Sequence, residues 1–471
     1  MPQRMVWSVV LVALVLASGA GAAAMISGHQ GGRVSLSQLA GPAGCLQGNG
    51  SYLDRDVCRR VDDLDGIDDI VVSPDGRHLY ALMPWRNTLM AFSRDQRTGE
   101  LRPLAGRARC MRRNPGMKCN RARAFAGPRG AAITPDGRTV YVSAETSSAV
   151  SVFARNRRNG ALRQRAGQAG CIANSPDTGC RDVRRLDSPG AIVVTKDGRN
   201  VYVAPLYSGI VVLARKAGLT QLPGRRGCAA ELDRGCAPAR ALEYGVWKSM
   251  ALSPDGRHLY VASPYDTDSS PRGSLAVFER MRDGTLRQLP GAAGCLVDPP
   301  PSEDDPNFEF YADCGAARAL TVPTSVAVTP NGRWVYVAAD DTIAIFQRNR
   351  VTGALSQASG AAGCVSIRGK QGCTPSPNLW DPWEIVVSPD GRYVYVASRF
   401  AVSVYARQGG VLQRVRDRGG CVSVNGGPVC SEGNGLWDSE LELALSPDRR
   451  HLYAGAGVSE EEGRLMIFRS R

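Results

Sequence analysis

One short motif recurs seven times along this chain. It reads SPDGRHLYALMP from Ser73 and SPDGRHLYVASP from Ser253, and the other copies begin at Thr134, Thr195, Thr329, Ser388 and Ser446. Successive copies are 61, 61, 58, 76, 59 and 58 residues apart. Self-similarity at such a spacing means that each copy occupies the same place in one structural unit, so the chain is an array of seven equivalent units.

Each unit has the turn chemistry of a small antiparallel sheet. A short apolar strand precedes the Pro-Asp-Gly turn, and a second strand containing a tyrosine follows it, as at Tyr80 and Tyr141. A third strand ends in an arginine such as Arg155, and a short fourth strand follows a polar turn that ends in glycine. Four short strands joined in this way make one blade of a β-propeller. The sequence therefore predicts an all-β, seven-bladed propeller with four-stranded antiparallel blades, in which the repeated tyrosines pack between blades.

The two ends of the chain are predicted to close the ring. The last unit stops after its third strand, at residues 465–468, whereas residues 35–40 resemble the fourth-strand segments of the other units. An N-terminal strand that completes the last blade removes the open sheet edges. A chain of 471 residues is thus expected to hold one propeller domain, over residues 25–471, in place of the three domains that its length alone suggests.

The N-terminus indicates export. Arg4 precedes an apolar run over residues 5–16, and small residues with A-x-A cleavage sites fill residues 17–24. These features are typical of a secretory signal peptide, predicted here over residues 1–24. No other segment approaches the length of a membrane span. We expect a secreted protein, in the periplasm, at the cell surface or in the medium, with no membrane span in the mature chain.

The cysteines fit the same oxidising compartment. Fourteen occur, in seven local pairs, each in a stretch rich in glycine, proline or arginine. Zinc sites more often show C-x2-C spacing with nearby histidines, so one disulfide in each of seven loops is predicted. The pairs are Cys45 and Cys58, Cys110 and Cys119, Cys171 and Cys180, Cys228 and Cys236, Cys295 and Cys314, Cys364 and Cys373, and Cys421 and Cys430.

The positive charge is carried almost entirely by arginine. The formal net charge is +14, and only five lysines are present. No nucleic-acid recognition motif accompanies it, so no sequence-specific nucleic-acid partner is expected. Residues 106–125 hold seven basic residues and no acidic one. Arginines also recur at the ends of the third strands, where they form either a basic crown that adheres to anionic polymers or ion pairs with the turn aspartates: Arg94 and Arg97, Arg155, Arg157 and Arg158, Arg215, Arg280 and Arg282, Arg348 and Arg350, Arg407 and Arg469.

The repeat D-G-R-x-[VL]-Y-V-A, followed by a V-x-V-[FY] strand and G-x-L, resembles the YVTN-type and lactonase-like seven-bladed propellers. The resemblance covers essentially the whole mature chain and implies the fold and a lactonase-like hydrolase activity. Such enzymes are described as using histidine, arginine and glutamate. Here His29 lies near the cleavage site, and His78, His258 and His451 repeat with the blade, which is typical of a structural turn residue. The H-E-x-x-H, G-x-S-x-G and P-loop motifs are missing.

Carboxylates interrupt the repeat near the ring axis. Four residues before each turn Ser or Thr, at the start of the innermost strand, stand Asp69, Gly130, Ala191, Ser249, Ser325, Glu384 and Glu442. Blades six, seven and one are neighbours, so Asp69, Glu384 and Glu442 should converge. Converging carboxylates repel one another unless a cation or an arginine lies between them. They are the candidate ligands of calcium or another divalent cation, and pairing with Arg129 and Lys248 is the alternative.

Tryptophans gather at the loops that enter the same end of the ring. Trp85, Trp247, Trp380 and Trp383, together with Arg129 and Lys248, are candidate ligand-binding residues. Aromatic rings there either stack on a sugar or an apolar ligand, or only anchor the loops.

Three functions remain open from the sequence. The leading interpretation is a secreted binding or scaffold module for a carbohydrate, a small lactone or a protein partner, with its site on the aromatic and acidic loops. The alternative is a lactonase-like hydrolase in which Asp69, Glu384 and Glu442 hold a cation that assists hydrolysis of a carboxylic ester or lactone. The third is adhesion to an anionic envelope polymer through the basic crown.

Overall fold

The computed structural model describes residues 34–49, 57–175, 179–207, 209–216, 218–231, 233–242, 249–265, 272–300, 311, 313–436, 440–457 and 463–470. The chain divides into two compact units, residues 1–33 and 34–471. The second unit is the one described below. The predicted signal peptide, residues 1–24, lies outside the described residues and stays a prediction.

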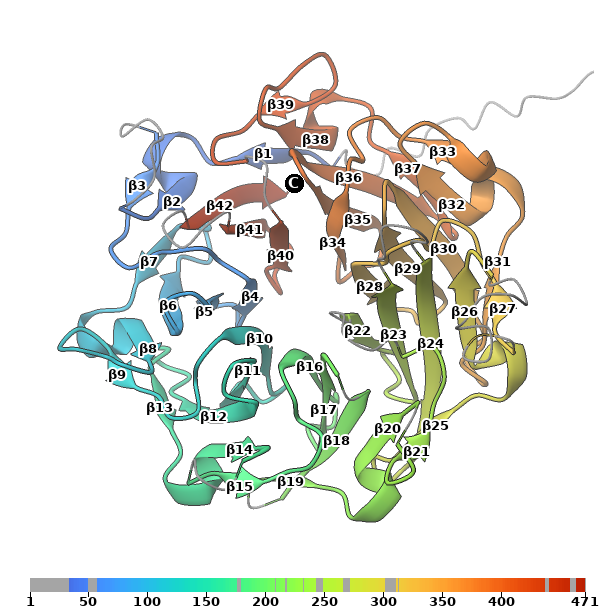
Figure 1. Ribbon diagram of the computed structural model, residues 1–471. Helices are drawn as coiled ribbons and strands as arrows, with labels where there is room; N and C mark the ends of the chain where they lie inside the picture. Colours follow the sequence, from blue (N-terminus) through green and yellow to red (C-terminus); the bar gives the residue numbers. More distant parts are fainter. Residues whose placement is uncertain are drawn as a thin grey trace, which may run out of the picture. The chain divides into compact units, whose positions relative to one another are not determined.

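Seven sheets stand around the axis of a ring, one sheet for each sequence repeat (Figure 1). The innermost strand of each blade contacts the innermost strand of the next, and β40 of the last blade contacts β4 of the first. The innermost strands, in blades one to seven, are β4 (Asp69–Val72), β10 (Pro128–Ile133), β16 (Pro189–Val194), β22 (Ser249–Leu252), β28 (Ser325–Val328), β34 (Pro382–Val387) and β40 (Leu441–Leu445).

The second and third strands of each blade form its longest hairpin. In the same blade order the second strands are β5 (His78–Met83), β11 (Thr139–Ala144), β17 (Asn200–Pro205), β23 (His258–Tyr265), β29 (Trp334–Ala339), β35 (Tyr393–Ser398) and β41 (His451–Gly457). The third strands are β6 (Thr88–Arg94), β12 (Ala149–Arg155), β18 (Ile210–Arg215), β24 (Arg272–Arg280), β30 (Thr342–Arg348), β36 (Ala401–Gln408) and β42 (Gly463–Ser470).

The fourth strand of each blade is broken into two pieces, both of which pair antiparallel with the third strand. The first pieces are β7 (Leu101–Pro103), β13 (Leu162–Gln164), β19 (Leu219–Gln221), β25 (Leu286–Gln288), β31 (Leu355–Gln357), β37 (Val411–Arg414) and, in blade seven, β1 (Leu36–Gln38). The second pieces are β8 (Cys110–Arg112), β14 (Cys171–Ala173), β20 (Cys228–Ala230), β26 (Cys295–Asp298), β32 (Cys364–Ser366), β38 (Cys421–Ser423) and β2 (Cys45–Gln47).

A short 3-10 turn separates the two pieces. These turns are η2 (Gly106–Arg109), η3 (Gly167–Gly170), η5 (Gly224–Gly227), η6 (Gly291–Ala293), η7 (Gly360–Gly363), η9 (Arg418–Gly420) and η1 (Gly41–Ala43), and a further turn, η8 (Lys370–Gly372), lies in the blade-five cysteine loop. Of the seven turns that separate the fourth-strand pieces, six begin with a glycine at positive φ, such as Gly106 at 58° and Gly167 at 53°. A side chain there would be strained, because L-residues rarely adopt this backbone conformation.

Each cysteine loop adds an outermost strand that runs parallel to the second piece of the fourth strand. These strands are β9 (Asn120–Arg121), β15 (Arg181–Asp182), β21 (Ala237–Pro238), β27 (Gly315–Ala316), β33 (Thr374–Pro375), β39 (Ser431–Glu432) and β3 (Arg59–Arg60). The prediction of four-stranded blades is thus corrected to six strands in each sheet. The cysteine segment is part of the sheet because its disulfide holds the short parallel strand against the blade.

All seven predicted disulfides are present. They join Cys45 to Cys58, Cys110 to Cys119, Cys171 to Cys180, Cys228 to Cys236, Cys295 to Cys314, Cys364 to Cys373, and Cys421 to Cys430. No free cysteine remains among the residues described. Sequence neighbours pair because each bridge spans only one loop.

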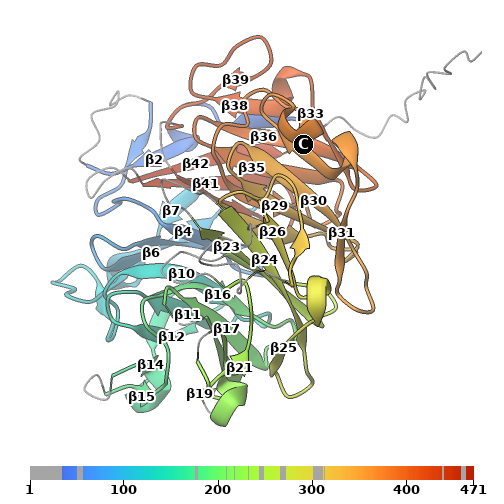
Figure 2. The ribbon, with the colours of Figure 1, turned by 45° about the vertical axis from the view of Figure 1, so that its right-hand side comes forward.

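The N-terminal segment completes the last blade, as predicted. Leu36 of β1 pairs with Ser470, and Cys45 of β2 pairs with Met466 of the same C-terminal strand, β42. In both views β2 and β42 lie side by side (Figures 1 and 2). Joining the two ends of the chain in one sheet leaves no unpaired third-strand edge in blade seven.

At several hairpin turns a buried clamp joins two neighbouring blades. Arg94 of blade one donates from Nε to the hydroxyl of Tyr453 at 2.6 Å and forms an ion pair with Asp448 at 2.9 Å, both in blade seven. Its Nη2 lies 2.7 Å from Nδ1 of His451. Arg155 makes the same three contacts with Asp75, His78 and Tyr80, and Arg348 makes them with Asp255, His258 and Tyr260.

These clamps bear on two of the sequence expectations. The repeated tyrosines are buried, as predicted, and His78, His258 and His451 contact the clamp arginines. Arg94, Arg155 and Arg348 are buried and paired with turn aspartates, so these three side chains do not contribute to a basic crown. Other arginines of the predicted crown are exposed, and adhesion through it stays a prediction: Arg97, Arg157, Arg158, Arg282 and Arg350. Among the described residues no helix is long and apolar enough to cross a membrane.

Candidate functional site

The three predicted carboxylates lie at equivalent places on adjacent blades. Asp69 begins β4, and Glu384 and Glu442 lie near the starts of β34 and β40. The inner strands β34 and β40 contact each other, as do β40 and β4. The three side chains are close enough to influence one another's ionisation, so the predicted convergence is present.

Each of the three carboxyl groups is harder to ionise than in water. Burial raises the pKa of Asp69 to about 7 and the pKa of Glu384 to about 8. Burial, followed by the negative charges of Glu384 and Asp69, raises the pKa of Glu442 well above its usual range. Desolvation and like charge both disfavour the ionised forms. At neutral pH the three residues therefore include both protonated and ionised carboxyl groups. Because they interact, their protons are shared among the three and are not assigned to one residue.

We call Asp69, Glu384 and Glu442 the carboxyl cluster. Asp69 and Glu442 each accept one hydrogen bond, from different kinds of donor. Oδ2 of Asp69 accepts the backbone N–H of Ala131 in the next blade at 2.6 Å. Ser249 and Ser325 stand at the same position in blades four and five, and their hydroxyls accept the backbone N–H groups of Val326 and Ile385. Asp69 thus joins two blades through a backbone donor. The donor to Oε1 of Glu442 is instead a side chain, Nε1 of Trp383, at 3.1 Å.

Arg129 lies beside the cluster but is paired with other carboxylates. Its Nη1 is 2.5 Å from Asp68 and its Nε is 2.7 Å from Glu145. The positive charge of Arg129 lowers the pKa of Asp68, against a larger rise caused by burial. The sequence reasoning missed Asp68 and Glu145. The signal for Asp68 was its place directly before Asp69, one residue ahead of β4.

The predicted aromatic residues do not share one site. Trp85 and Trp380 are 57% and 44% exposed, and the guanidinium carbon of Arg368 lies 5.7 Å from the ring centroid of Trp380. Trp383 is partly buried against Glu442. Trp247 and Lys248 lie outside the described residues. Among the predicted ligand-binding residues that the structure describes, Trp383 is hydrogen-bonded to the carboxyl cluster.

The cluster was also tested as a metal site. Over the described part of the chain, no three His, Cys, Asp or Glu side chains are arranged to hold a metal ion. Two of its carboxylates are engaged by an N–H donor, an arrangement that suits hydrogen bonding and proton transfer. The calcium site at Asp69, Glu384 and Glu442 therefore stays a prediction.

One protein-family model matches part of the repeat region. Residues 117–222 match the family model described as "Lactonase, 7-bladed beta-propeller". Together with the seven blades, this match confirms the predicted resemblance: the chain is a seven-bladed β-propeller that is similar to the lactonase propellers. No curated protein matches the chain.

Several solved structures are similar. One is a candidate 6-phosphogluconolactonase from Bacteroides uniformis, with 20% identity, coverage of 74% of this chain and 83% of that one, and a TM-score of 0.46. Another, from Bacteroides fragilis and described in the same terms, has 17% identity, coverage of 80% and 88%, and a TM-score of 0.47. Hydrazine synthase of Kuenenia stuttgartiensis has 18% identity, coverage of 89% and 98%, and a TM-score of 0.49.

Proposed function

We propose that the chain hydrolyses a lactone, a cyclic carboxylic ester, at the carboxyl cluster. The observation that carries the proposal is the set of interacting carboxyl groups on three adjacent inner strands, whose pKa values are raised toward neutrality. Pairs of carboxyls that hold one proton between them supply an acid and a base in the same site. The lactonase family match over residues 117–222 supports this reaction class.

The reaction needs one base and one acid. In the proposed mechanism an ionised carboxylate of the cluster takes a proton from water, and the resulting hydroxide oxygen bonds to the lactone carbonyl carbon. A protonated neighbour then donates its proton to the ring oxygen as the C–O bond breaks, which leaves an open-chain hydroxy acid. The two carboxyls end with their protonation states exchanged and regain them through solvent.

The contacts suggest how the roles are divided. Asp69 has the least raised pKa of the three, about 7, and is the assigned base. Glu442, whose pKa is raised well above its usual range, is the assigned acid, with its carboxyl group oriented by Nε1 of Trp383. Activity is then expected to rise with pH through about 7, as Asp69 ionises, and to fall at higher pH once Glu442 loses its proton.

The test is hydrolysis of neutral γ- and δ-lactones by the purified, oxidised protein, followed by acid release with and without EDTA. Glu442→Gln and Asp69→Asn are each expected to lower kcat about 100-fold or more, because general acid–base groups contribute at least that much. Glu279→Gln, which removes a carboxylate in the outer part of blade four, is the matched control. Hydrolysis that all three variants retain would overturn the proposal, and loss of activity in EDTA would return the cation hypothesis.

We also propose that the protein works in an oxidising compartment outside the cytoplasm. Seven disulfides support this, since such bridges persist mainly in exported proteins. N-terminal sequencing of the protein recovered from the producing cells tests the export signal. A mature chain that begins near residue 25 is expected, and a cytoplasmic chain that keeps residues 1–24 would contradict the proposal.

A further inference from the structure

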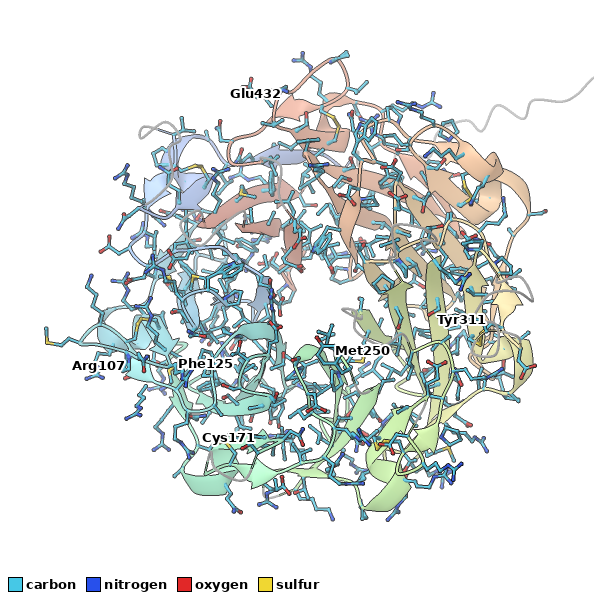
Figure 3. The ribbon with its side chains drawn as sticks, in the orientation of Figure 1. Arg107, Phe125, Cys171, Met250, Tyr311 and Glu432 are labelled. Carbon is cyan, nitrogen blue, oxygen red and sulfur yellow. A yellow bond between two sulfur atoms is a disulfide. The ribbon has the colours of Figure 1, made fainter. Side chains whose placement is uncertain are left out.

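A cationic groove lies on the outer wall of the ring, remote from the carboxyl cluster. Its volume is about 740 Å³, and its walls come from the β3 end of blade seven and from β7, η2 and the cysteine loop of blade one. Figure 3 shows Arg107, which lines it, at the outer margin, with Met250 of the inner strand β22 near the centre. The lining holds six cationic side chains and one carboxylate, that of Asp62: Arg59, Arg60, Arg102, Arg107, Arg109 and Lys118.

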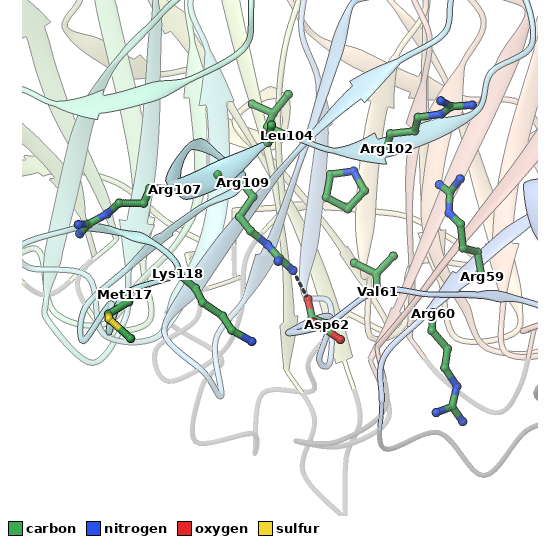
Figure 4. Close-up of a pocket in the computed structure, with 13 residues that line it drawn as sticks. Arg59, Arg60, Val61, Asp62, Arg102, Leu104, Arg107, Arg109, Met117 and Lys118 are labelled. Atoms are coloured by element: carbon green, nitrogen blue, oxygen red, sulfur yellow. Dashed lines mark hydrogen bonds between the residues drawn. The ribbon is translucent and has the colours of Figure 1, made fainter.

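The cations flank an apolar floor. Figure 4 shows Arg59, Arg60 and Arg102 along one side of the groove and Arg107 and Lys118 along the other, with Val61 and Leu104 between them. Pro103 and Ala105 complete the floor. Charged walls over an apolar strip suit a ligand with anionic groups on a ring that has an apolar face.

A second groove continues the same surface. It lies between blades one and two, measures about 530 Å³, and contains Arg121, Arg123, Arg163 and Arg165 with no acidic residue. Its floor includes Met111 and Leu162. The loop closed by the Cys110–Cys119 disulfide borders both grooves. We refer to the two grooves together as the cationic band, which extends over blades seven, one and two.

The band departs from the sevenfold symmetry of the fold. The same register position carries an arginine in blades one, two and four, namely Arg102, Arg163 and Arg287. In blades three, five, six and seven it carries Thr220, Ser356, Gln413 and Ser37. The outermost strand is Arg59–Arg60 beside the first groove and Ser431–Glu432 in blade six. The fold needs these strands at every blade but does not need an arginine at this position, so the fold alone does not explain the charge of the two grooves.

Several of these cations have no ion-pair partner among the residues that the structure describes. Arg59 and Arg102 pair with Glu100, and Arg109 lies 3.8 Å from Asp63. By contrast Arg60, Lys118, Arg121 and Arg163 are exposed, and within the described ranges none of them has a carboxylate partner within 4 Å. These four side chains are available to a ligand, unlike the buried arginines of the interblade clamps.

We propose that this band binds a linear acidic glycan, whose sugar rings lie on the apolar floor and whose carboxylate groups pair with the arginines. Arginine forms bidentate pairs with carboxylates, and a chain of repeated anions matches cations spread over two grooves. Neither lining contains an aromatic side chain, so the stacking platforms that hold single-stranded nucleic acid are missing from both. The occupant is therefore a polysaccharide in preference to a nucleic acid.

The experiment measures binding of polygalacturonate fragments by calorimetry at about 50 mM and about 200 mM salt. The band variant is Arg60→Glu, Arg121→Glu and Arg163→Glu. The control variant is Arg97→Glu, Arg287→Glu and Arg333→Glu, which changes the net charge equally at exposed positions outside the two grooves. The expected result is affinity that falls with salt and is lowered about tenfold or more in the band variant, with less than a twofold change in the control.

Three results would overturn the proposal: no binding by the native protein at the lower salt concentration, equal weakening in the two variants, or tighter binding of duplex or single-stranded DNA than of polygalacturonate. Dextran, a neutral glycan, should not bind, and dextran binding equal to that of polygalacturonate also contradicts it. Thermal melting of each variant shows whether it is folded. If the band variant is not folded, Arg60→Gln with Arg163→Gln replaces it, and the same affinity loss is required.

Discussion

Replacing Glu384 by glutamine should stabilise the propeller above neutral pH. A carboxyl group whose pKa rises from 4.5 to about 8 on folding contributes fully to stability below its unfolded-state pKa. That contribution is lost as the pH rises through about 8, because the folded protein must then hold a charge that burial and Asp69 disfavour. Glutamine keeps the shape of the side chain and carries no charge at any pH.

The size of the effect follows from the pKa change. A rise from 4.5 to about 8 corresponds to about 5 kcal/mol for a carboxylate without solvent contact, at 1.36 kcal/mol for each pKa step. The Glu384 side chain is partly exposed, and solvent screening reduces the electrostatic cost. We expect Glu384→Gln to raise the free energy of unfolding by about 2 kcal/mol at pH 9, and by less than about 0.5 kcal/mol at pH 5.

Urea unfolding of the oxidised protein at pH 5, 7 and 9 measures this difference. Asp448→Asn is the control of opposite sign. The hydroxyl of Ser446, the backbone N–H of Arg450 and the buried Arg94 hold the pKa of Asp448 below its usual value despite partial burial. That contribution is present above the unfolded-state pKa, so the substitution should destabilise at all three pH values. Destabilisation by Glu384→Gln at pH 9 would refute the account of the cluster.

Three further expectations concern the architecture. Arg155→Met leaves Asp75 and Tyr80 without their buried partner and should cost about 3 kcal/mol in urea unfolding at pH 7; a loss below about 1 kcal/mol contradicts the clamp. Burial and Arg155 lower the pKa of His78 to about 4, so its contribution is present above about pH 6.5 and is lost as the pH falls through 4. His78→Asn, which copies Asn200 at the same place in blade three, should flatten the loss of stability between pH 6.5 and 4, and an unchanged pH profile argues against the assignment. Removal of the Cys171–Cys180 bridge by a double alanine substitution should cost about 2 to 3 kcal/mol, and equal unfolding midpoints would show that the loop is held by packing alone.

The sequence alone determined the blade number, the closure of the ring and the pairing of the cysteines. A repeat fixes these because each unit contains its own turns, its own strands and both halves of its disulfide, so short-range pattern carries the information. The buried tyrosines followed for the same reason, since Tyr80 and its equivalents recur at one position of one strand. The convergence of Asp69, Glu384 and Glu442 also followed, once adjacent blades were known to share an axis.

Contacts between blades were decided only by the tertiary structure. Arg94 and Asp448 are far apart in sequence and belong to the first and last units, so no local pattern showed that the arginine is buried beside Tyr453 and His451 instead of exposed in a crown. No local pattern showed either that Arg129 forms ion pairs with Asp68 and Glu145 and not with the carboxyl cluster. The pKa values and the cationic band likewise depend on burial and neighbours that arise only when separate units are brought together, because desolvation and Coulomb energy depend on distance in space and not on distance along the chain.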